Sequence, residues 1–588
     1  MVEGPSREVD RRGLHSILKR RGFFWPSFEI YGGVAGFFDL GPLGSLLKDN
    51  IERIWKQRFV VEEEFLLVDC PSINPEAVFK ASGHLEKFSD HLTRCQDCGV
   101  PFRADHLLES LVKNPDTLDK EELEEALTQY GVACPDCGGK LGPLEEFNLM
   151  FSTQIGPGNE KRAYLRPETA QSIFLDFNSL YRFNRERMPF GVAQIGRGYR
   201  NEISPRQGMI RLREFHMAEG EFFYDPEEDT FPRFERYRDK EVPLVPNTDP
   251  ERTISRELGS AVSEGIISSR VMAHFMGATF SFAEDIGIPK EAIRFRQHEA
   301  SEMAHYAMDC WDLEVSTSWG WVETVGIADR SAYDLSQHSK GSGSQLTADR
   351  KFEIPVERVI NRLEGDMKVL GPVLRSDAGA VMEVLSRMDP EFISSALETS
   401  ETIPITVGDR TVEVPSNGIR IVKGTEKVHR ESYIPSVIEP SFGIDRLMVG
   451  LLENNYREQA ASPLSDDESE EPYRVISLPP GTAPIKAGVF PLVNKDGLPK
   501  IASEIDLKLK REGLVTYMDT SGSIGRRYAR MDEVGTPFCI TVDHDTKKDR
   551  TVTIRERDTG AQVRVGIDDL PELLNGLIHE RVAFSSLG

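Results

Sequence analysis

The segment from Gly198 to Phe223, GYRNEISPRQGMIRLREFHMAEGEFF, concentrates charged side chains in two runs on either side of a Ser204-Pro205 turn. Successive strand side chains point to opposite faces, so Arg200 and Glu202 are predicted to share a face of the outgoing strand. One face of the returning strand carries Arg211, Arg213, Phe215, Met217, Glu219 and Glu221. This face indicates the floor of a functional site; the alternative is a solvated antiparallel edge whose charges pair across the strands.

Four of the seven cysteines form two Cys-x-x-Cys knuckles, each followed by glycine: Cys95 with Cys98, and Cys134 with Cys137. Four thiolates in this arrangement suit tetrahedral Zn²⁺. A redox Cys-x-x-Cys and a ribbon that has lost its metal are the alternatives. Residues 115–130, between the knuckles, are predicted to contain a short acidic helix, and Cys70, Cys310 and Cys539 are predicted to be core residues.

Length and composition predict a soluble protein of several domains, with 588 residues, 39% hydrophobic and 28% charged. No apolar run approaches the roughly 20 residues that span a bilayer, and the start lacks a signal-peptide segment, so we expect a cytoplasmic protein without a membrane partner. The net charge of −25 argues only weakly against nucleic acid, because a duplex responds to charge within a Debye length of about 10 Å. Basic residues do cluster locally, at Lys19–Arg21 and Arg526–Arg530 among other places.

The spacing of apolar residues predicts a helix and a strand before the cysteine knuckles. Leu46, Leu47, Ile51, Ile54, Trp55 and Phe59 follow helical spacing. The run EEFLLVDCPSINPEAVF then predicts a strand that ends at Pro75. Because an isolated helix of this kind would expose Leu47, Ile51 and Trp55, we expect residues 43–75 to form a homodimer interface.

The rest of the chain divides by composition. Residues 225–294 are predicted to be a charged, mostly helical insert, and Trp319–Gly326 a buried strand. A second insert, 339–430, contains helices and a predicted hairpin, IPITVGDRTVEV. SPLSDDESEEP, at 462–472, is predicted to be an acidic linker, and 473–588 an alternating strand-and-helix module.

The motifs GPLGSLLKDNIERIW, ASGH, LRPETAQ, GYRNEISPRQGMIRLREF, GWVETVGIADRSAYDL and EPSFGIDRL, followed by IGRRYARMDEVGTPFCITVD, closely resemble the glycyl-tRNA synthetases. They resemble the homodimeric class II form found in archaea and eukaryotes, in order and over nearly the whole chain. The resemblance implies an α+β fold: a class II antiparallel sheet flanked by helices, a zinc-ribbon insert and a C-terminal α/β anticodon-binding domain. It assigns 1–94, 141–224, 295–338 and 431–461 to the catalytic core, 95–140 to the ribbon, 225–294 and 339–430 to inserts, 462–472 to the linker and 473–588 to the anticodon-binding domain.

The resemblance also implies an activity. The protein would activate glycine with ATP to glycyl-adenylate and pyrophosphate, then transfer glycine to the 3′ end of tRNA(Gly), using Mg²⁺ with ATP and a structural Zn²⁺. Arg200, Glu323 and Arg446 would be catalytic. The implied ATP-binding set is Arg200, Asn201, Glu202, Arg211, Leu212, Phe215, Glu323, Thr324, Gly443 and Arg446.

Individual roles follow from the same resemblance. Arg200 would contact the α-phosphate and the attacking carboxylate, Glu202 the adenine amino group, and Arg211 the terminal phosphates. Phe215 and Arg446 would stack on opposite faces of the adenine, and Glu323 would help to hold Mg²⁺. For Arg446 the alternative is a helix-start cation that merely satisfies a carboxylate.

For the amino acid, the resemblance implies a pocket of carboxylates around the ammonium. Its residues would be Glu168, Glu219, Glu439, Pro440 and Ser441, with Arg103 as a further candidate for contact with the substrate or the tRNA end. The hairpin's arginines would then face ATP and its carboxylate end glycine. Ordinary surface pairing of the three glutamates is the alternative.

In the C-terminal module, Arg526, Arg527 and Arg530 would contact tRNA phosphates. A non-catalytic synthetase relative is disfavoured because Arg200 and Arg446 are both present. A zinc-ribbon nucleic-acid-binding protein is disfavoured because the knuckles lie among acidic residues. Specificity for threonine, proline or histidine is disfavoured by EPSFGIDR and LRPETAQ.

Overall fold

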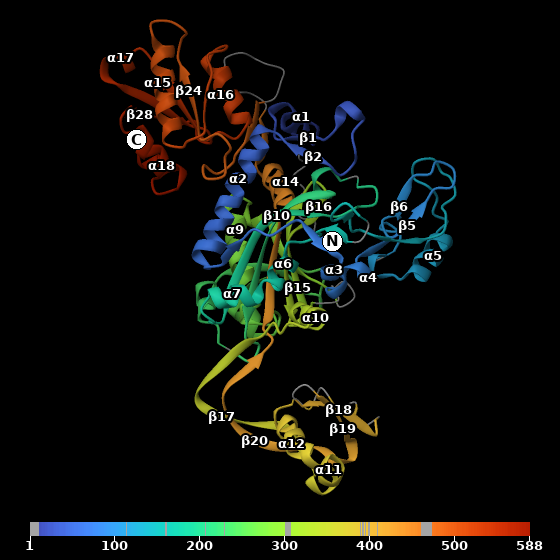
Figure 1. The fold of residues 1–588 in the computed structure, drawn as a ribbon. Helices are drawn as coiled ribbons and strands as arrows, with labels where there is room; N and C mark the ends of the chain where they lie inside the picture. Colours follow the sequence, from blue (N-terminus) through green and yellow to red (C-terminus); the bar gives the residue numbers. More distant parts are fainter. Residues whose placement is uncertain are drawn as a thin grey trace. The chain divides into compact units, whose positions relative to one another are not determined.

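The computed structural model describes residues 11–112, 115–158, 161–205, 207–228, 230–299, 307–388, 390, 393, 396–397, 400–407, 410–459 and 473–587. They form two compact units: Met1–Leu346 with Ile434–Gly588, and Thr347–Tyr433 (Figure 1). The linker predicted at 462–472 lies outside the described residues. In the part of the chain that the structure describes, no helix is both long and apolar enough to cross a bilayer.

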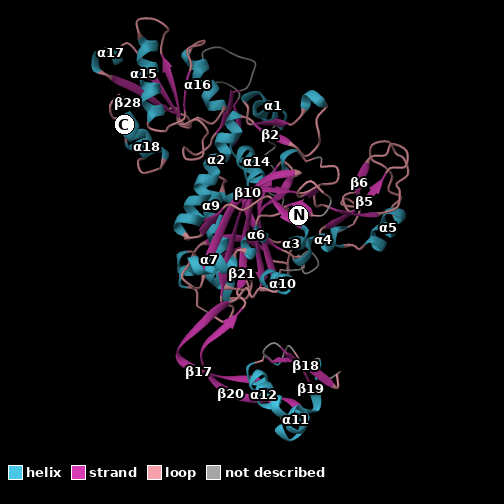
Figure 2. Cartoon of the chain, in the orientation of Figure 1, coloured by secondary structure: helices cyan, strands magenta, loops and turns pink. Residues whose placement is uncertain are grey.

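A nine-stranded sheet forms the centre of the first unit, with its strands in magenta in Figure 2. Its order is β13 (Ile254–Glu257), β12 (Glu241–Val245), β14 (Ile293–Gln297), β15 (Asp309–Thr317), β16 (Gly320–Ser331), β21 (Ser436–Gly443), β11 (Glu214–Tyr224), β10 (Phe190–Tyr199) and β3 (Leu66–Val68). All neighbouring pairs are antiparallel except β12 with β14 and β10 with β3, which are parallel. The expected antiparallel core is confirmed.

Three helices share one hydrophobic core with this sheet: α2 (Pro42–Lys56), α9 (Arg270–Ile286) and α14 (Ile444–Asn455). Nearly every residue of α9 is buried, as expected for a helix that is apolar all round. Smaller helices complete the core: α1 (Arg11–Arg21), α6 (Ala170–Leu175), α7 (Phe177–Phe183), α8 (Leu258–Ser263) and α10 (Tyr333–Ser342). A short β1–β2 ribbon (Phe24–Pro26 and Phe38–Leu40) precedes α2.

Two expectations about this core differ from the structure. Residues 225–294 are not a separate helical insert, because they supply β12, β13 and the start of β14 to the central sheet together with the buried helix α9. Charged residues at the exposed positions of these elements hid the strand pattern. The strand β16 is buried only from Thr324 onward, and Trp319 before it is 49% exposed.

The apolar face of α2 is covered by the chain's own sheet. Leu47, Ile51 and Trp55 are fully buried, and the Trp55 ring meets Phe442 of β21 edge-on at 5.8 Å. A π-helical segment, Gln57–Glu62, continues α2 and buries Phe59. The helix therefore needs no dimer partner to cover its apolar residues, because they pack within the same chain. The expectation that it would expose them is wrong.

A ribbon and a second small sheet flank the core. The ribbon contains β5 (Ser89–Arg94), β6 (Pro101–Arg103) and β7 (Glu145–Asn148), with the expected acidic helix at α5 (Lys120–Gln129). Asp119 and Glu122 form a capping box at its start. The other sheet contains β4 (Ile73–Pro75), β9 (Arg162–Leu165) and β8 (Ser152–Gln154), beside α3 (Glu76–Ala81) and α4 (His84–Lys87).

The second unit is built on a long antiparallel pair, β17 (Ala348–Gly365) with β20 (Ile419–Tyr433). It carries α11 (Met367–Leu374), α12 (Ala378–Arg387) and the hairpin β18–β19 (Thr402–Val407 and Arg410–Pro415). The predicted hairpin is confirmed. The unit begins at Thr347 rather than 339, because α10 packs in the first unit.

The C-terminal module is a five-stranded mixed sheet. Its order is β25 (Thr516–Met518), β24 (Ala487–Pro491), β26 (Phe538–Val542), β27 (Thr551–Glu556) and β28 (Gln562–Gly566), with the first three parallel. Its helices are α15 (Leu498–Arg511), α16 (Ile524–Glu533), α17 (Thr546–Asp549) and α18 (Leu570–Ile578), and β22 (Tyr456–Gln459) pairs with β23 (Tyr473–Ile476) before it. The alternating strand-and-helix prediction is confirmed.

Candidate active site

The loop between β10 and β11 is longer than the expected turn. β10 ends at Tyr199 and β11 begins at Glu214, so Arg200, Glu202, Arg211 and Arg213 lie in the loop rather than on strand faces. Contacts from other segments hold it: the Arg213 guanidinium donates to Ala35 O at 2.6 Å and Glu202 O at 2.8 Å. Arg213 therefore braces the loop, and the strand pattern was wrong for the positions before Glu214.

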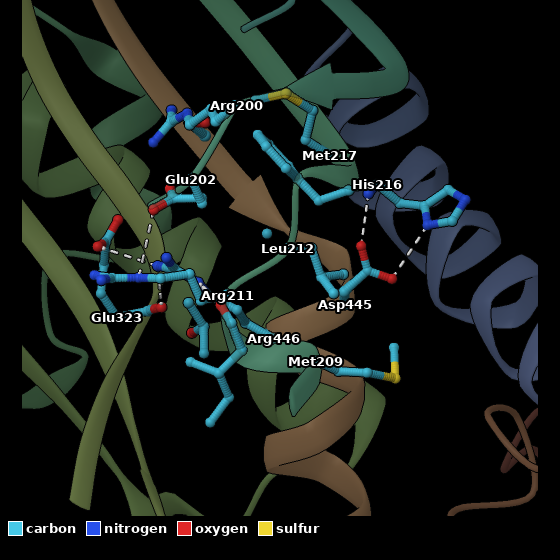
Figure 3. A pocket seen from close by; sticks show the side chains of 15 residues that line it. Arg200, Glu202, Met209, Arg211, Leu212, His216, Met217, Glu323, Asp445 and Arg446 are labelled. Carbon is cyan, nitrogen blue, oxygen red and sulfur yellow. Dashed lines mark hydrogen bonds and ion pairs between the residues drawn. The ribbon is translucent and has the colours of Figure 1, made fainter. Parts of the chain in front are cut away.

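Beneath this loop is a pocket of about 620 Å³ (Figure 3). It is lined by Arg200, Glu202, Met209, Ile210, Arg211, Leu212, Phe215, His216, Met217, Glu323, Thr324, Ser441, Gly443, Asp445 and Arg446. Nine of the ten residues expected to bind ATP line it. The exception is Asn201, whose backbone N–H donates to Leu149 O at 2.7 Å.

Arginines surround the pocket's aromatic ring. The Arg200 guanidinium carbon lies 5.4 Å from the centre of the Phe215 ring and 5.4 Å from that of Phe88. Arg446, in the first turn of α14, donates to Ile210 O at 3.0 Å and pairs with the Glu323 carboxylate at 3.2 Å. The salt bridge matches the simpler interpretation of Arg446, but both partners border the pocket and are accessible to a ligand.

Two residues without an assigned role hold the pocket walls. Asp445 accepts hydrogen bonds from the His216 backbone N at 2.6 Å and from its ring Nδ1 at 3.1 Å, tying α14 to β11. His106, from the ribbon, lies 2.6 Å from an Arg211 guanidinium nitrogen. Burial, with the Arg103 and Arg211 cations, lowers the pKa of His106 to about 4, so a neutral imidazole accepts this bond.

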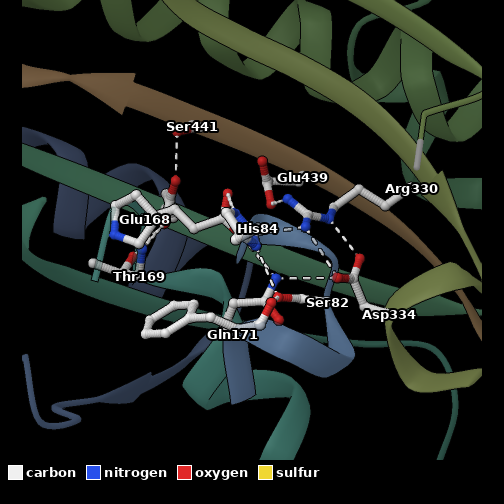
Figure 4. Close-up of polar contacts among 12 residues, drawn as sticks. Ser82, His84, Glu168, Thr169, Gln171, Arg330, Asp334, Glu439 and Ser441 are labelled. Atoms are coloured by element: carbon white, nitrogen blue, oxygen red, sulfur yellow. Dashed lines mark hydrogen bonds and ion pairs between the residues drawn. The ribbon is translucent and has the colours of Figure 1, made fainter. Parts of the chain in front are cut away.

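A second, buried cluster lies on the adjoining part of the sheet (Figure 4). The Ser441 hydroxyl donates to Glu219 at 2.7 Å, and the Thr169 backbone N and hydroxyl both donate to Glu219 at 2.5 Å. Glu168 and Glu439 are brought to the same place, since both contact Arg330, at 3.3 and 2.6 Å. The three expected glutamates and Ser441 therefore do converge, with Pro440 between Glu439 and Ser441 on β21.

Arg330 is the member of this cluster that the sequence did not single out. It is fully buried near the end of β16, and its guanidinium is held by Asp334 at the start of α10, at 2.8 Å (Figure 4). His84 of the ASGH motif adds a contact of 3.6 Å to Glu168. No local spacing rule pairs Arg330 with Asp334, because Arg330 lies near the end of a strand and Asp334 at the start of the next helix.

The cluster contains more carboxylates than cations, and their pKa values reflect this. Burial raises the pKa of Glu439 to about 8, against the opposing Arg330 cation and with help from Glu219 and Glu168. Burial and Glu168 also raise the pKa of Glu219. Burial alone would raise the pKa of Glu168, but Arg330 and His84 outweigh it and lower that pKa well below the ordinary value. Such a cluster favours a cationic ligand.

Arg103 does not join this cluster. It pairs with Asp90 at 3.0 Å and Asp105 at 2.5 Å within the ribbon. Its contact with the substrate or the tRNA end therefore stays a prediction, made by a guanidinium that two carboxylates already hold.

The four knuckle cysteines come together as predicted, with Sγ–Sγ separations of 3.5 Å for Cys95–Cys137 and 3.7 Å for Cys98–Cys134. Zn–S bonds of about 2.3 Å at tetrahedral angles require sulfur separations of about 3.8 Å. The geometry therefore fits zinc. Cys310 and Cys539 are buried as predicted, whereas Cys70 is only partly buried.

The C-terminal arginines have different surroundings from those expected. Arg527 is buried and donates to the backbone carbonyls of Pro491 and Gly522, the latter at 2.9 Å. Arg530 pairs with Asp519. Only Arg526 of the three is exposed, so Arg527 is not available to a phosphate.

Comparison with known proteins identifies both domains. Residues 151–238 match the tRNA synthetase class II core domain (G, H, P, S and T), and residues 486–577 match the anticodon binding domain. The chain is 46% identical to the glycine–tRNA ligase of Methanothrix thermoacetophila, over 97% of this chain and 98% of that protein. It is also 46% identical to the glycine–tRNA ligase of Methanocaldococcus jannaschii, over 96% and 99%.

Solved structures agree at the level of the fold. A prolyl-tRNA synthetase of Giardia lamblia, solved with prolyl-adenylate, superposes with a TM-score of 0.50 at 12% identity, covering 96% of this chain and 79% of its own. A Cryptosporidium parvum prolyl-tRNA synthetase, solved with halofuginone and AMPPNP, gives 0.50 at 11% identity, over 97% and 76%. The full-length identity to the archaeal enzymes decides the assignment: this chain belongs to the glycine–tRNA ligase family of class II aminoacyl-tRNA synthetases.

Proposed function

We propose that the loop pocket binds ATP and that the buried carboxylate cluster binds glycine in the glycine–tRNA ligase reaction. One observation carries this division: Phe215 and Glu219 lie on the same strand, β11, one in each site. Four residues of a strand span about 13 Å. That length separates an adenine stacked on Phe215 from an ammonium held by Glu219, leaving the α-phosphate between them.

In activation, the glycine carboxylate attacks the α-phosphorus and pyrophosphate leaves in line. Two anions must approach, so positioning and electrostatic stabilisation supply most of the catalysis. Arg200 lies over Phe215, where its guanidinium neutralises charge on the α-phosphate and orients the attacking carboxylate. Arg446 leaves its salt bridge with Glu323 to cover the second adenine face, and Arg211 neutralises the terminal phosphates.

Glycine is selected by what the pocket holds and by what it excludes. Glu219 accepts from the ammonium, while Glu168 and Glu439 add negative potential and stay in place through Arg330. The Ser441–Glu219 hydrogen bond closes the space that a side chain would need. Excluding a methyl group by contact discriminates strongly, whereas attraction to one methyl is worth only about 1–3 kcal/mol.

The residues present fit a magnesium ion beside the ATP phosphates. A Cβ at Gly326 would lie 3.8 Å from an Asp312 carboxylate oxygen and 4.0 Å from one of Glu323, so the two carboxylates flank one spot. Burial and Glu323 raise the pKa of Asp312 to about 6, a repulsion that a cation relieves. Glu323 and Asp312 would hold Mg²⁺ there, and the ion would supply positive charge against the phosphates.

Zinc in the cysteine cluster would have a structural role. The ribbon touches the ATP loop twice, through Ser204 Oγ to Pro101 O at 2.6 Å and through His106 to Arg211. A metal that holds the ribbon therefore also supports the loop.

The partners are tRNA(Gly) and a second copy of the chain. The tRNA binds through the C-terminal module, which has Arg526 on its surface. The protein acts in the cytoplasm.

Edge strand β3 and its surroundings leave Val61, Leu67 and Ile73 exposed by 60%, 48% and 47%. This exposure supports a homodimer through the β3 edge rather than through the buried face of α2. Sedimentation at micromolar concentration should give a dimer that Leu67→Glu dissociates. A monomeric wild type would overturn this assignment.

The decisive experiment is pyrophosphate exchange measured with each standard amino acid in turn. Glycine alone should support exchange, because we expect the site around Ser441 and Glu219 to exclude the side chains of alanine and serine. Arg200→Ala should reduce the glycine-dependent rate by roughly 10²–10³-fold, as loss of a charge-stabilising group does. Exchange with threonine, proline or histidine but not glycine would refute the specificity, and full activity of the Arg200 variant would refute the role of that residue.

A further inference from the structure

Glu221 lies two residues beyond Glu219 on β11 and is fully buried. The register that pairs Glu219 with Ser441 and Phe222 with Ile438 sets Glu221 opposite Glu439 of β21. Like charges directly opposite each other in neighbouring strands are destabilising. This pair lies inside the central sheet, so one member must be neutralised.

Hydrogen bonding indicates that Glu221, rather than Glu439, is the neutral member of the pair. Arg330 donates to a Glu439 carboxylate oxygen at 2.6 Å, so Glu439 has a cationic partner. Among the described residues, no group donates a hydrogen bond to either carboxylate oxygen of Glu221. A buried carboxylate without a donor is costly, whereas a protonated carboxyl becomes a donor itself and has the Glu439 carboxylate as its neighbour.

We propose that Glu221 is a positioning residue for glycine recognition. It keeps its proton and donates a hydrogen bond to Glu439, which holds that carboxylate aligned between Arg330 and the substrate ammonium. The inference rests on the assignment of the cluster as the glycine site. A carboxylate offers about four acceptor positions, so Glu439 can serve Arg330, Glu221 and an ammonium together.

The charged groups that face Glu221 favour its protonated form. Burial, then Glu439 on β21 and Glu219 on β11, raise the pKa of Glu221 well above its ordinary value against the Arg330 cation on β16. The pKa of Glu439 is also raised, to about 8, so the pair retains a proton near neutral pH. Arg330 donates to Glu439 and favours its ionised form, which leaves that proton on Glu221. Because both values lie above those of an unfolded chain, the stability from the shared proton is complete below the ordinary glutamate pKa and is lost as the pH rises through the raised values.

Two substitutions of similar volume test the donor. Glu221→Gln keeps an N–H toward Glu439, and Glu221→Met fills the space without one. Glycine and ATP KM values from pyrophosphate exchange should show glutamine within about twofold of wild type at pH 7. Methionine should raise the glycine KM by about tenfold, as loss of one hydrogen bond does, with the ATP KM unchanged. Equal glycine KM values for the two variants would overturn the proposal.

The pH profile separates a proton donor from a space filler. As the pH rises through the raised pKa of Glu221, the wild-type glycine KM should rise, and Glu221→Gln should lack this rise because an amide cannot lose its donor. Infrared difference spectra between wild type and Glu221→Gln at pH 7 should show the loss of one protonated-carboxyl band in the variant. A glutamine variant with the wild-type alkaline rise, or without loss of the band, would refute the proposal. If Glu219→Gln and Glu439→Gln leave the glycine KM unchanged, the glycine site itself is misassigned.

Discussion

Replacing Glu219 by glutamine tests the glycine site with little structural disturbance. Glu219 is buried and accepts three hydrogen bonds, two from Thr169 and one from Ser441. A glutamine amide oxygen can keep the Thr169 pair. Its NH₂ group then faces the Ser441 hydroxyl, which can rotate to accept. The substitution therefore removes a negative charge and leaves the packing intact.

The expected loss follows from that charge. A hydrogen bond to a charged group contributes about 1.5–3 kcal/mol and a neutral one about 1 kcal/mol. The difference, roughly 0.5–2 kcal/mol, corresponds to an increase of about 2- to 30-fold in the glycine KM. The ATP KM should stay within about twofold, because Phe215, Arg200 and Arg446 are untouched.

The effect should depend on pH in a defined direction. Burial and Glu168 raise the pKa of Glu219, and the ammonium needs the ionised form. The advantage of wild type over Glu219→Gln is therefore complete above that raised pKa and shrinks as the pH falls through it. Pyrophosphate exchange at pH 6 and 8 would measure both gaps.

A matched control uses the same strand. Glu214 pairs with Arg197 outside the pocket, so Glu214→Gln should leave both KM values unchanged. An unchanged glycine KM for Glu219→Gln, or an equal rise in the ATP KM, would refute the proposed division into two sites.

Three other substitutions probe the supporting structure. Arg330→Met leaves Glu168, Glu439 and Asp334 without their shared cation and should destabilise the core by about 3–5 kcal/mol, seen as a lower Tm; an unchanged Tm would mean that the carboxylates are neutral in wild type. Purified protein should contain about one zinc per chain by metal analysis, and Cys95→Ser should abolish it and raise the ATP KM through the ribbon contacts, whereas zinc-free wild type would contradict the ribbon assignment. Arg526→Ala should raise the KM for tRNA severalfold, with a shallower salt dependence, and leave pyrophosphate exchange intact; impaired exchange would place Arg526 in a structural role.

Local residue spacing gave correct predictions wherever the backbone kept the regular geometry that the spacing assumes. Alternation along β11 correctly placed Phe215, Met217 and Glu219 beside the two sites, and the paired knuckles correctly brought four cysteines together. Both patterns depend on backbone geometry within a few residues. The same alternation failed at Arg211 and Arg213, because the backbone leaves the strand before Glu214 and contacts with Ala35 and Leu149 shape the loop.

The sequence by itself therefore determined the family, the order of the domains and most of the residues that border the loop pocket. Only the tertiary structure decided which charges are shared and which faces are covered. Arg330 becomes the centre of the buried carboxylate cluster because three separate segments bring carboxylates to it, and the apolar face of α2 is buried by β21 of its own chain. Burial and ion pairing depend on contacts between residues far apart in sequence, and no local period encodes them.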